Sequence, residues 1–509
     1  MSNDAVEAER MHPEGPLGLS AADGESPFTS QSPSPVPSEG PCVAELAPAL
    51  DSAKALLVRS DNHTQPDLIA ETRRKSFQKQ KNVVSPTQAG DSLRRYGDEV
   101  PTSSRWTQHK KHFFILSSAG KPIYSRYGDE AKLSSFMGLI QAILSFFASD
   151  DDSIRCLNAG SHKFVFSMKG PLYLVAVSST GESEPQLRQQ LECLYAQILF
   201  VLTGAALTRI FETRGNYDLR NLLSGTEMFL DHLSGAFQRG SGYFLGAIPC
   251  LRMSSRLRQK IGNVLATGTP KSLVFGILIA RDKLVTLVRP KRYSLHPTDL
   301  HLVMNMISSS SGFRSVETWT PVCLPQFNNR AFLHTYVCFL GTDLCLVLAS
   351  TDKDAFFEMS EYKQQISQGL EITGCVEAID DAVRADPYSI VEVEVPSLRH
   401  FIYKSTTLVQ YTEPSLSAPY TRKEDRRRLL RAYQYALERM HARENPARVI
   451  FHATPTEAVM SYSTPTHEIY ASFSPLVSKA AAMEGIAGLQ KWIKREESSI
   501  FVPSAPVFW

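Results

Sequence analysis

Paired cysteines are missing from this sequence of 509 residues. Its eight cysteines are scattered singly, and no two of them have the C-x-x-C spacing of a zinc ribbon. Dispersed cysteines also argue against a disulfide framework and are typical of a chain that works in a reducing compartment. The sequence therefore excludes a zinc ribbon and disfavours a disulfide-stapled secreted domain.

Long hydrophobic runs are missing as well. A long stretch without a charge, residues 193–208, contains Gln197 and Thr203 and is shorter than the ~18 apolar residues of a membrane span. Acidic residues stand among the first ten positions, where a signal peptide would carry basic ones. We expect a cytoplasmic chain that does not cross a membrane.

Neither sign of charge is in excess. Lys and Arg number 54 against 52 Asp and Glu, a net charge of +2, which argues against a large nucleic-acid-binding surface. Hydrophobic residues make up 43% and charged residues 21%, as in globular proteins. At ~100–200 residues per domain, the length indicates roughly three domains.

Residues 1–104 differ in composition from the rest of the chain. The first fifty contain eight prolines and seven serines but a single aromatic residue, Phe28. Such a segment has too little apolar surface to bury, so we predict a disordered regulatory tail. Within it, Arg73, Arg74 and Lys75 begin a basic cluster, which is either a solvated linker or a segment that docks on an anionic membrane or on the folded domains.

The remaining chain shows one order of predicted elements three times: a hairpin, a helix, further strands and a helix. In the first copy the strands are 112–117, 122–127, 154–157, 163–168 and 172–178, and the helices are 129–148, 187–202 and 219–237. In the second copy the strands are 272–280, 283–288, 331–340 and 343–350, and the helices are 297–309 and 352–370. In the third copy the strands are 388–395, 400–404, 448–453, 458–463 and 469–474, and the helices are 421–441 and 478–496.

The three copies also have similar spacing. The first hairpin and the later strand pair start 51, 60 and 59 residues apart, from Phe113, Leu273 and Ile390 to Phe164, Leu333 and Val449. The shared order and near-equal spacing predict three copies of one α+β unit, and hairpin connections predict largely antiparallel sheets. We place the three domains at 105–240, 241–380 and 381–509.

No catalytic constellation is recognisable. Gly120-Lys121 lacks the other residues of a phosphate-binding loop, and His296 and His301 are five positions apart, which puts them on different faces of a helix. We therefore expect no catalytic residues, no metal site, no cofactor and no enzyme that makes or breaks bonds.

Two surfaces are candidates for binding. The predicted helix 129–148 carries Leu139 and Phe146 beside its core stripe, so its apolar face is wider than one sheet requires. This extra width is covered either by a neighbouring domain of the same chain or by a second protein. The densest basic patch lies in the predicted helix 421–441, and it is either a solvated face or a site for acidic lipid headgroups. The residues of this patch taken as lipid-binding candidates are Arg422, Lys423, Arg426 and Arg427.

Several stretches closely resemble the animal Mon-one family of vacuolar (lysosomal) fusion proteins, over about residues 105–505. They are HKKHFFILS (109–117), AGKPIYSRYG (119–128), NYDLRNLLSG (216–225), HPTDLHL (296–302), WTPVCLP (319–325) and LRHFIYKS (398–405). The resemblance implies three longin domains, in agreement with the three α+β units.

The resemblance also implies a function. Members of this family pair with the Ccz-one protein, and the heterodimer is the guanine-nucleotide exchange factor for a Rab-seven type GTPase on late endosomes, lysosomes and autophagosomes. It is recruited to membranes marked by a Rab-five type GTPase and phosphoinositides, so the chain would be cytoplasmic and peripherally attached to anionic endosomal membrane. The alternative is a trafficking scaffold or tether without exchange activity, because longin folds also serve as adaptors.

In this family the first longin domains of the two subunits are understood to form the platform for the GTPase. Carried onto this chain, the resemblance points to residues 109–180. The candidate contacts are Arg126 and Tyr127 at the end of the predicted hairpin and Ser134 and Ser135 at the start of the first helix. The alternative is that these four are ordinary exposed residues.

Overall fold

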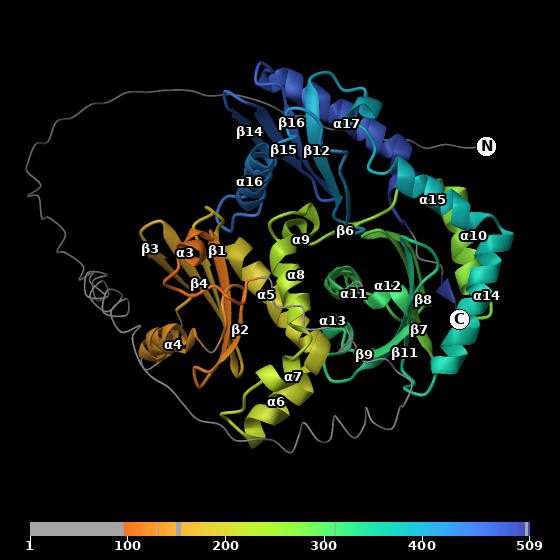
Figure 1. Cartoon of the computed structure of the whole chain (residues 1–509). Helices are drawn as coiled ribbons and strands as arrows, with labels where there is room; N and C mark the ends of the chain where they lie inside the picture. Colours follow the sequence, from red (N-terminus) through yellow and green to blue (C-terminus); the bar gives the residue numbers. More distant parts are fainter. Residues whose placement is uncertain (1–95, 131, 149–153, 311, 504–506, 509) are drawn as a thin grey trace, which may run out of the picture. The chain divides into compact units, whose positions relative to one another are not determined.

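The structure is a computed structural model that describes residues 96–130, 132–148, 154–310, 312–503 and 507–508. Within these residues three sheets of mainly antiparallel strands follow one another along the chain, each flanked by helices (Figure 1). The predicted α+β class with three similar units is therefore confirmed. The basic cluster at Arg73, Arg74 and Lys75 lies outside the described residues.

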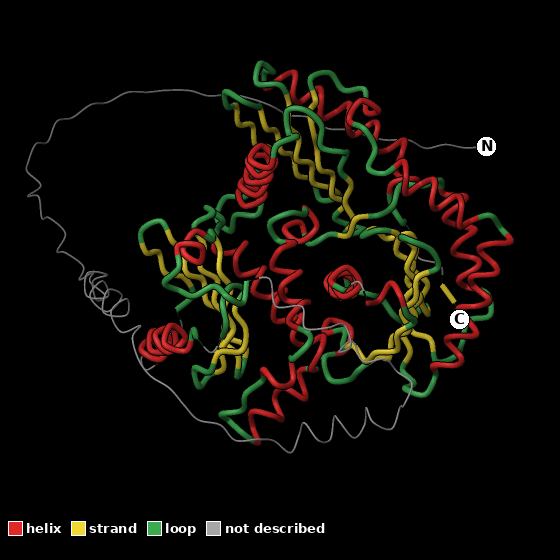
Figure 2. The backbone as a smooth tube through the Cα atoms, viewed as in Figure 1, coloured by secondary structure: helices red, strands yellow, loops and turns green. Residues whose placement is uncertain are grey.

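The first sheet has the strand order β2-β1-β5-β4-β3 and lies between two helices (Figure 2). Its strands are β1 (Lys111–Ser117), β2 (Pro122–Ser125), β3 (Cys156–Ala159), β4 (His162–Lys169) and β5 (Leu172–Ser178). Side chains alternate between the two faces of a strand. Phe114 of β1 accordingly packs under helix α4 (Ser134–Ala148), whereas Phe113 packs under helix α5 (Glu184–Leu202). The short helix α3 (Ser104–Gln108) precedes this sheet.

Several short helices follow α5. They are α6 (Gly204–Thr213), α7 (Arg220–Leu223), α8 (Glu227–Ala236) and α9 (Ser241–Leu245). The sequence predicted one helix over 219–237, but the chain divides it in two around Gly225, whose φ of +82° suits glycine. No single helix of the described residues is long and apolar enough to cross a membrane, and only α5 and α6 together, bent by 82°, pass that test.

The second sheet has the order β17-β8-β7-β11-β10-β9. Its strands are β7 (Leu273–Ala280), β8 (Lys283–Pro290), β9 (Thr318–Val322), β10 (Leu333–Phe339), β11 (Leu344–Ser350) and β17 (Val507–Phe508). One face is covered by α10 (Ser255–Ala266), α14 (Phe356–Ile372) and α15 (Cys375–Ala385).

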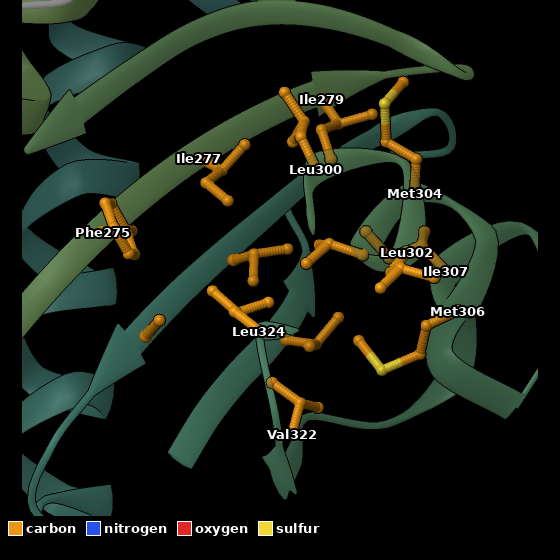
Figure 3. Packing of buried hydrophobic residues seen from close by; sticks show 14 of the residues in the cluster. Phe275, Ile277, Ile279, Leu300, Leu302, Met304, Met306, Ile307, Val322 and Leu324 are labelled. Carbon is orange, nitrogen blue, oxygen red and sulfur yellow. The ribbon is translucent and has the colours of Figure 1, made fainter. Parts of the chain in front are cut away.

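The other face of the second sheet packs on α11 (Pro297–Ser309). Phe275, Ile277 and Ile279 of β7 lie against the apolar side of this helix (Figure 3). Short helices α12 (Gly312–Ser315) and α13 (Pro325–Asn328) complete this side of the unit. The helix at 297–309 was predicted, whereas α10, α15 and β9 were not.

The third sheet has the order β14-β15-β16-β12-β13-β6. Its strands are β6 (Ile248–Pro249), β12 (Leu398–Ser405), β13 (Gln410–Thr412), β14 (Val449–Ala453), β15 (Ala458–Ser463) and β16 (His467–Phe473). Helix α16 (Lys423–Met440) covers one face and helix α17 (Lys479–Ile500) covers the other.

The predicted strand at 388–395 is wrong. Residues Ile390–Val393 form a 3-10 turn, because the Ser389 side chain accepts from the Val391 N–H while Glu392 Oε1 accepts from the Ser389 N–H at 3.0 Å. Because this capping box stabilises a helical turn, the segment does not adopt the extended conformation of a strand. The hairpin of the third unit therefore starts at Leu398, 51 residues before Val449, which equals the spacing of the first unit.

Short strands connect the second and third sheets. β6, which precedes the second sheet in the chain, pairs in parallel with β13 of the third sheet, and β17, at the end of the chain, pairs in parallel with β8 of the second. Arg258 of α10 is 6% exposed and donates to the carbonyl oxygens of Leu251, Val285 and Ser499, at 2.9, 2.6 and 3.0 Å. One buried guanidinium thus connects α10 and β8 with the end of α17.

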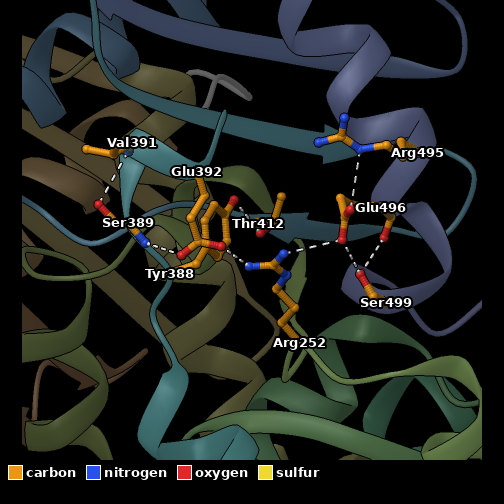
Figure 4. A network of polar contacts seen from close by, with 9 residues as sticks. All are labelled: Arg252, Tyr388, Ser389, Val391, Glu392, Thr412, Arg495, Glu496 and Ser499. Carbon is orange, nitrogen blue, oxygen red and sulfur yellow. Dashed lines mark hydrogen bonds and ion pairs between the residues drawn. The ribbon is translucent and has the colours of Figure 1, made fainter. Parts of the chain in front are cut away.

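A second arginine lies at the same junction (Figure 4). Arg252 forms ion pairs with Glu392 at 2.6 Å and with Glu496 at 3.3 Å. Its guanidinium also lies 5.2 Å from the ring centre of Tyr388 and 5.7 Å from that of Trp492. The second and third units are therefore bound together by charge as well as by shared strands.

Replacing Arg258 by methionine should lower the free energy of unfolding by about 3 kcal/mol, because three carbonyls, two of them in buried bonds, lose a charged donor. Urea unfolding followed by tryptophan fluorescence measures the change. The control is Arg256→Met, the same substitution at an exposed position of the same helix. Its free energy of unfolding should stay within ~0.5 kcal/mol of that of the parent chain. Equal unfolding midpoints for the two variants would contradict the role given to Arg258.

Candidate functional site

Helix α4 has an uncharged side that the described residues do not cover. Its sequence, SSFMGLIQAILSFFA, contains no charged residue. Met137, Ile140 and Leu144 are buried against the first sheet. On the opposite side Phe146 is 59% exposed, and Leu139 is half-buried. We call this side the α4 outer face; its residues are Ser134, Ser135, Gly138, Leu139, Ala142, Ile143, Ser145, Phe146 and Phe147.

Contacts with the β1–β2 turn and with the preceding segment hold α4 in place. Gln141 Nε2 donates to the Ser118 carbonyl at 2.7 Å, which ties the middle of the helix to the turn. At its first turn the Phe136 ring lies 5.1 Å from Phe114 and 6.0 Å from Trp106. The outer face is therefore presented by a fixed helix and not by a loop.

Arg126 and Tyr127, two of the predicted GTPase contacts, are engaged inside the domain. Arg126 Nη1 is 3.0 Å from Asp231 Oδ1, and its side chain is 14% exposed. Burial acts to lower the pKa of this guanidinium, but the neighbouring oxygens of Tyr124 and Asp231 outweigh it and raise the pKa. Tyr127 is 8% exposed and stacks on His109 with ring centres 3.6 Å apart.

The other two predicted contacts, Ser134 and Ser135, are exposed at the start of α4. They belong to the same surface as Leu139 and Phe146, the predicted partner-interface residues. The structure thus brings four of these six predicted residues together on one helix. It gives the remaining two, Arg126 and Tyr127, internal contacts.

The segment 96–110, here called the strap, packs on the first domain. The sequence analysis did not predict this contact. His109 Nε2 lies 2.8 Å from Glu99 Oε2, and the Gly128 N–H donates to the Tyr96 carbonyl at 3.0 Å. Gly128 has φ +82°, and a Cβ there would come within 2.8 Å of the Glu99 carbonyl, so glycine is required. The sequence feature that could have indicated this packing is the density of aromatic and histidine residues between positions 96 and 112.

An open hollow of about 490 Å³ lies along this strap and is lined by polar residues. These are Tyr96, Asp98, Glu99, Arg105, Gln108 and His109. Among the residues that the structure describes, no group of three or more His, Cys, Asp or Glu is placed to hold a metal ion.

The basic helix predicted at 421–441 is α16. Leu429 and Tyr433 face the third sheet, as expected, and are 2% and 1% exposed. The four lipid-binding candidates, Arg422, Lys423, Arg426 and Arg427, are all exposed. Arg426 donates to the Tyr420 and Thr421 carbonyls, which fixes the start of the helix.

The neighbouring Arg428 is paired with acids. Its guanidinium bonds Asp425 at 2.6 Å and the buried Glu457 at 3.0 Å. The free positive charge of this patch therefore belongs to the exposed residues at the start of α16 and not to Arg428.

His112 of β1 is buried, and its Nδ1 has no hydrogen-bond partner among the residues that the structure describes. Burial, reinforced by the nearby His109, lowers the pKa of His112 from 6.5 to about 4. Between these two values the unfolded chain binds a proton that the folded chain does not bind. The contribution of neutral His112 to the free energy of unfolding is therefore fully present above pH 6.5 and is lost as the pH falls toward 4.

The variant His112→Phe should be less sensitive to acid than the parent chain. Phenylalanine keeps the ring contacts with Trp106 and Phe114 but cannot be protonated. Lowering the pH from 7 to 5 should cost the parent about 2 kcal/mol more than the variant. Urea titrations at both pH values measure this difference, with His452→Phe at an exposed position as the control. A parental pH dependence in His112→Phe would refute the assignment.

Comparison with known proteins agrees with this architecture. Residues 111–233 match the family model described as the first longin domain of FUZ, MON1 and HPS1. Residues 271–368 and 397–497 match the second and third longin domains of the same proteins. The three units of the structure are therefore three longin domains.

Several relatives that match most of the chain are named MON1. Vacuolar fusion protein MON1 homolog A of Homo sapiens is 44% identical over 408 residues, which are 80% of this chain and 63% of that protein. The Bos taurus homolog A is 44% identical over 80% of this chain and 74% of its own length. The human MON1 homolog B is 37% identical over 83% of this chain and 81% of its own length. With this identity across all three longin domains, the chain belongs to the MON1 family.

Proposed function

We propose that this chain is one subunit of a heterodimeric guanine-nucleotide exchange factor that acts in fusion with the vacuole or lysosome. The relatives are named vacuolar fusion proteins, which supports the coarser part of this proposal. The finer part is that the partner is the Ccz-one protein and that the substrate is a Rab-seven type GTPase of late endosomes, lysosomes and autophagosomes. The α4 outer face is the observation that carries it.

The α4 outer face has the character of a protein interface. A helix of 15 residues is about 22 Å long and here carries no charge, although one side is turned away from the described chain. Large exposed apolar side chains such as Phe146 are tolerated singly, but a continuous uncharged face is typical of an interaction site. Because the face lies on the first longin domain, it fits the platform expected from the family resemblance.

An exchange factor of this kind needs no catalytic residues. It binds the nucleotide-free GTPase most tightly, and by thermodynamic reciprocity the affinity of the GTPase for nucleotide falls by the same factor. We propose that Ser134 and Ser135 face the GTPase from the start of α4, while Leu139 and Phe146 face the partner subunit. Arg126, paired with Asp231 of α8, and Tyr127, stacked on His109, keep contacts inside the domain.

In this proposal, positively charged residues recruit the protein to the membrane. Arg422, Lys423, Arg426 and Arg427 of α16 offer an exposed basic surface to anionic lipid, at about 1 kcal/mol per charge near the bilayer. The basic cluster 73–75 in the tail would add to it, and a Rab-five type GTPase would mark the membrane to be bound. A trafficking scaffold or tether without exchange activity is the competing function.

The exchange reaction separates these two functions. Release of a fluorescent nucleotide from a Rab-seven type GTPase should be fast with both subunits and nearly as slow as spontaneous release with either subunit alone. Leu139→Asp with Phe146→Asp should weaken the heterodimer at least tenfold, because the interface would have to bury two carboxylates. Phe357→Asp, at a 77% exposed position of α14, should leave pairing and exchange unchanged.

Two outcomes would contradict the proposal. A heterodimer that forms normally but does not accelerate release identifies a scaffold. If the Asp variants of α4 unfold the isolated chain, as judged by its thermal midpoint, these residues are intramolecular core and not an interface.

Binding to vesicles tests the basic surface. Reversing the charge of Arg422, Lys423 and Arg427 to Glu should weaken binding to vesicles with 30% phosphatidylserine at least tenfold, as measured by co-sedimentation. The same reversal at Arg256, Lys260 and Lys271, three exposed residues of the second domain, changes net charge equally and serves as the control. Equal losses in both variants would show that net charge alone governs binding.

A further inference from the structure

The third sheet ends on an edge strand that lacks the usual protection. Edge strands normally avoid pairing with other chains by being short, by containing proline or charge, or by forming bulges. β2 and β9 contain Pro122 and Pro321, β3 has four residues, and β6 and β17 have two each. β14, with the sequence VIFHA, has five residues, no proline, no formal charge and an unshifted register with β15.

The free backbone groups of β14 can be assigned from its pairing. The Arg448 carbonyl accepts from the Ser463 N–H at 2.9 Å, and the Thr454 N–H donates to the Glu457 carbonyl at 2.9 Å. In an antiparallel pair, residues whose N–H and C=O groups bond the neighbouring strand alternate with residues whose N–H and C=O groups point away from it. The backbone groups of Val449, Phe451 and Ala453 therefore point away from β15. In the described part of the chain no strand lies on that side of β14.

The side chains of β14 offer apolar contacts on both faces of the sheet. Phe451 packs against the cluster under α17 and Ile450 against the cluster under α16, and both are half-buried. Val449 is 40% exposed. A strand added at this edge would cover apolar surface on both sides and satisfy a row of backbone donors and acceptors.

The charge around the edge selects the kind of strand. Residues 439–453 contain three arginines and one acid, Glu444. Arg439, Arg443 and Arg448 are exposed and form no ion pair within the described residues. Two copies of this chain meeting edge to edge would bring like charges together, and a bilayer core offers no partner for backbone N–H groups. An acidic peptide meets both requirements.

We propose that β14 is a docking edge for an extended acidic segment of another protein, which adds as a further strand of the third sheet. Its acidic residues lie against Arg443 and Arg448, and its backbone bonds Val449, Phe451 and Ala453. This surface is separate from the α4 outer face and does not depend on the exchange activity.

Amide hydrogen exchange of the full chain tests this proposal with a defined probe. The probe is a ten-residue fluorescein-labelled peptide of alternating Val and Thr with three Glu at one end, and its counterpart has Lys in place of Glu. The Glu peptide should slow exchange at Val449, Phe451 and Ala453 and bind at least tenfold tighter than the Lys peptide by fluorescence anisotropy. Arg443→Glu with Arg448→Glu should reverse this preference.

A pair of proline variants checks the geometry. Ala453→Pro removes an outward N–H and should weaken binding of the Glu peptide at least tenfold without lowering the thermal midpoint. His452→Pro removes an inward N–H and should lower the midpoint. Equal binding of the two peptides, or unchanged exchange at the three amides with saturating Glu peptide, would overturn the proposal. Displacement of the bound Glu peptide by vesicles with 30% phosphatidylserine would assign the charge to a membrane and also overturn it.

Discussion

The covering of each sheet by helices on both faces is the constraint on which the structure depends. The first sheet meets it with α4 on one face and α5 on the other. α5 is buried on two sides, because Leu191 belongs to the core of the first domain and Phe200 to that of the second. Within the described residues α4 packs on one core alone, so its uncharged second side is turned outward. The same burial that closes one domain thus leaves a surface that another protein can cover.

The second and third domains meet the constraint within the chain. Their sheets share strands through β6 and β17, and Arg258 bonds backbone carbonyls from both sides of the junction. The third domain keeps two polar surfaces that could bind other molecules. The basic residues of α16 offer charge, and the β14 edge offers unpaired backbone groups. The proposed binding surfaces therefore differ in chemistry, with an uncharged helix face on the first domain and charge and backbone pairing on the third.

The sequence was most informative where local chemistry decides the structure. The hairpins β1–β2 and β7–β8 and the helices α4, α11, α16 and α17 could be predicted from turn residues and periodicity. The strand expected at 388–395 failed because the Ser389 capping box outweighs the β-branched Ile390 and Val391. The internal role of Arg126 could not be predicted, since its partner Asp231 lies 105 positions away and is brought near only by the fold.

The central claim, that the α4 outer face is the surface on which the partner subunit docks, is most directly tested by amide hydrogen exchange of the full chain with and without the purified Ccz-one protein. The account predicts slower exchange across residues 134–147 in the complex and unchanged exchange across α14, which also carries exposed apolar side chains at Phe357 and Ile372. A stable complex in which exchange across residues 134–147 is unchanged would contradict it.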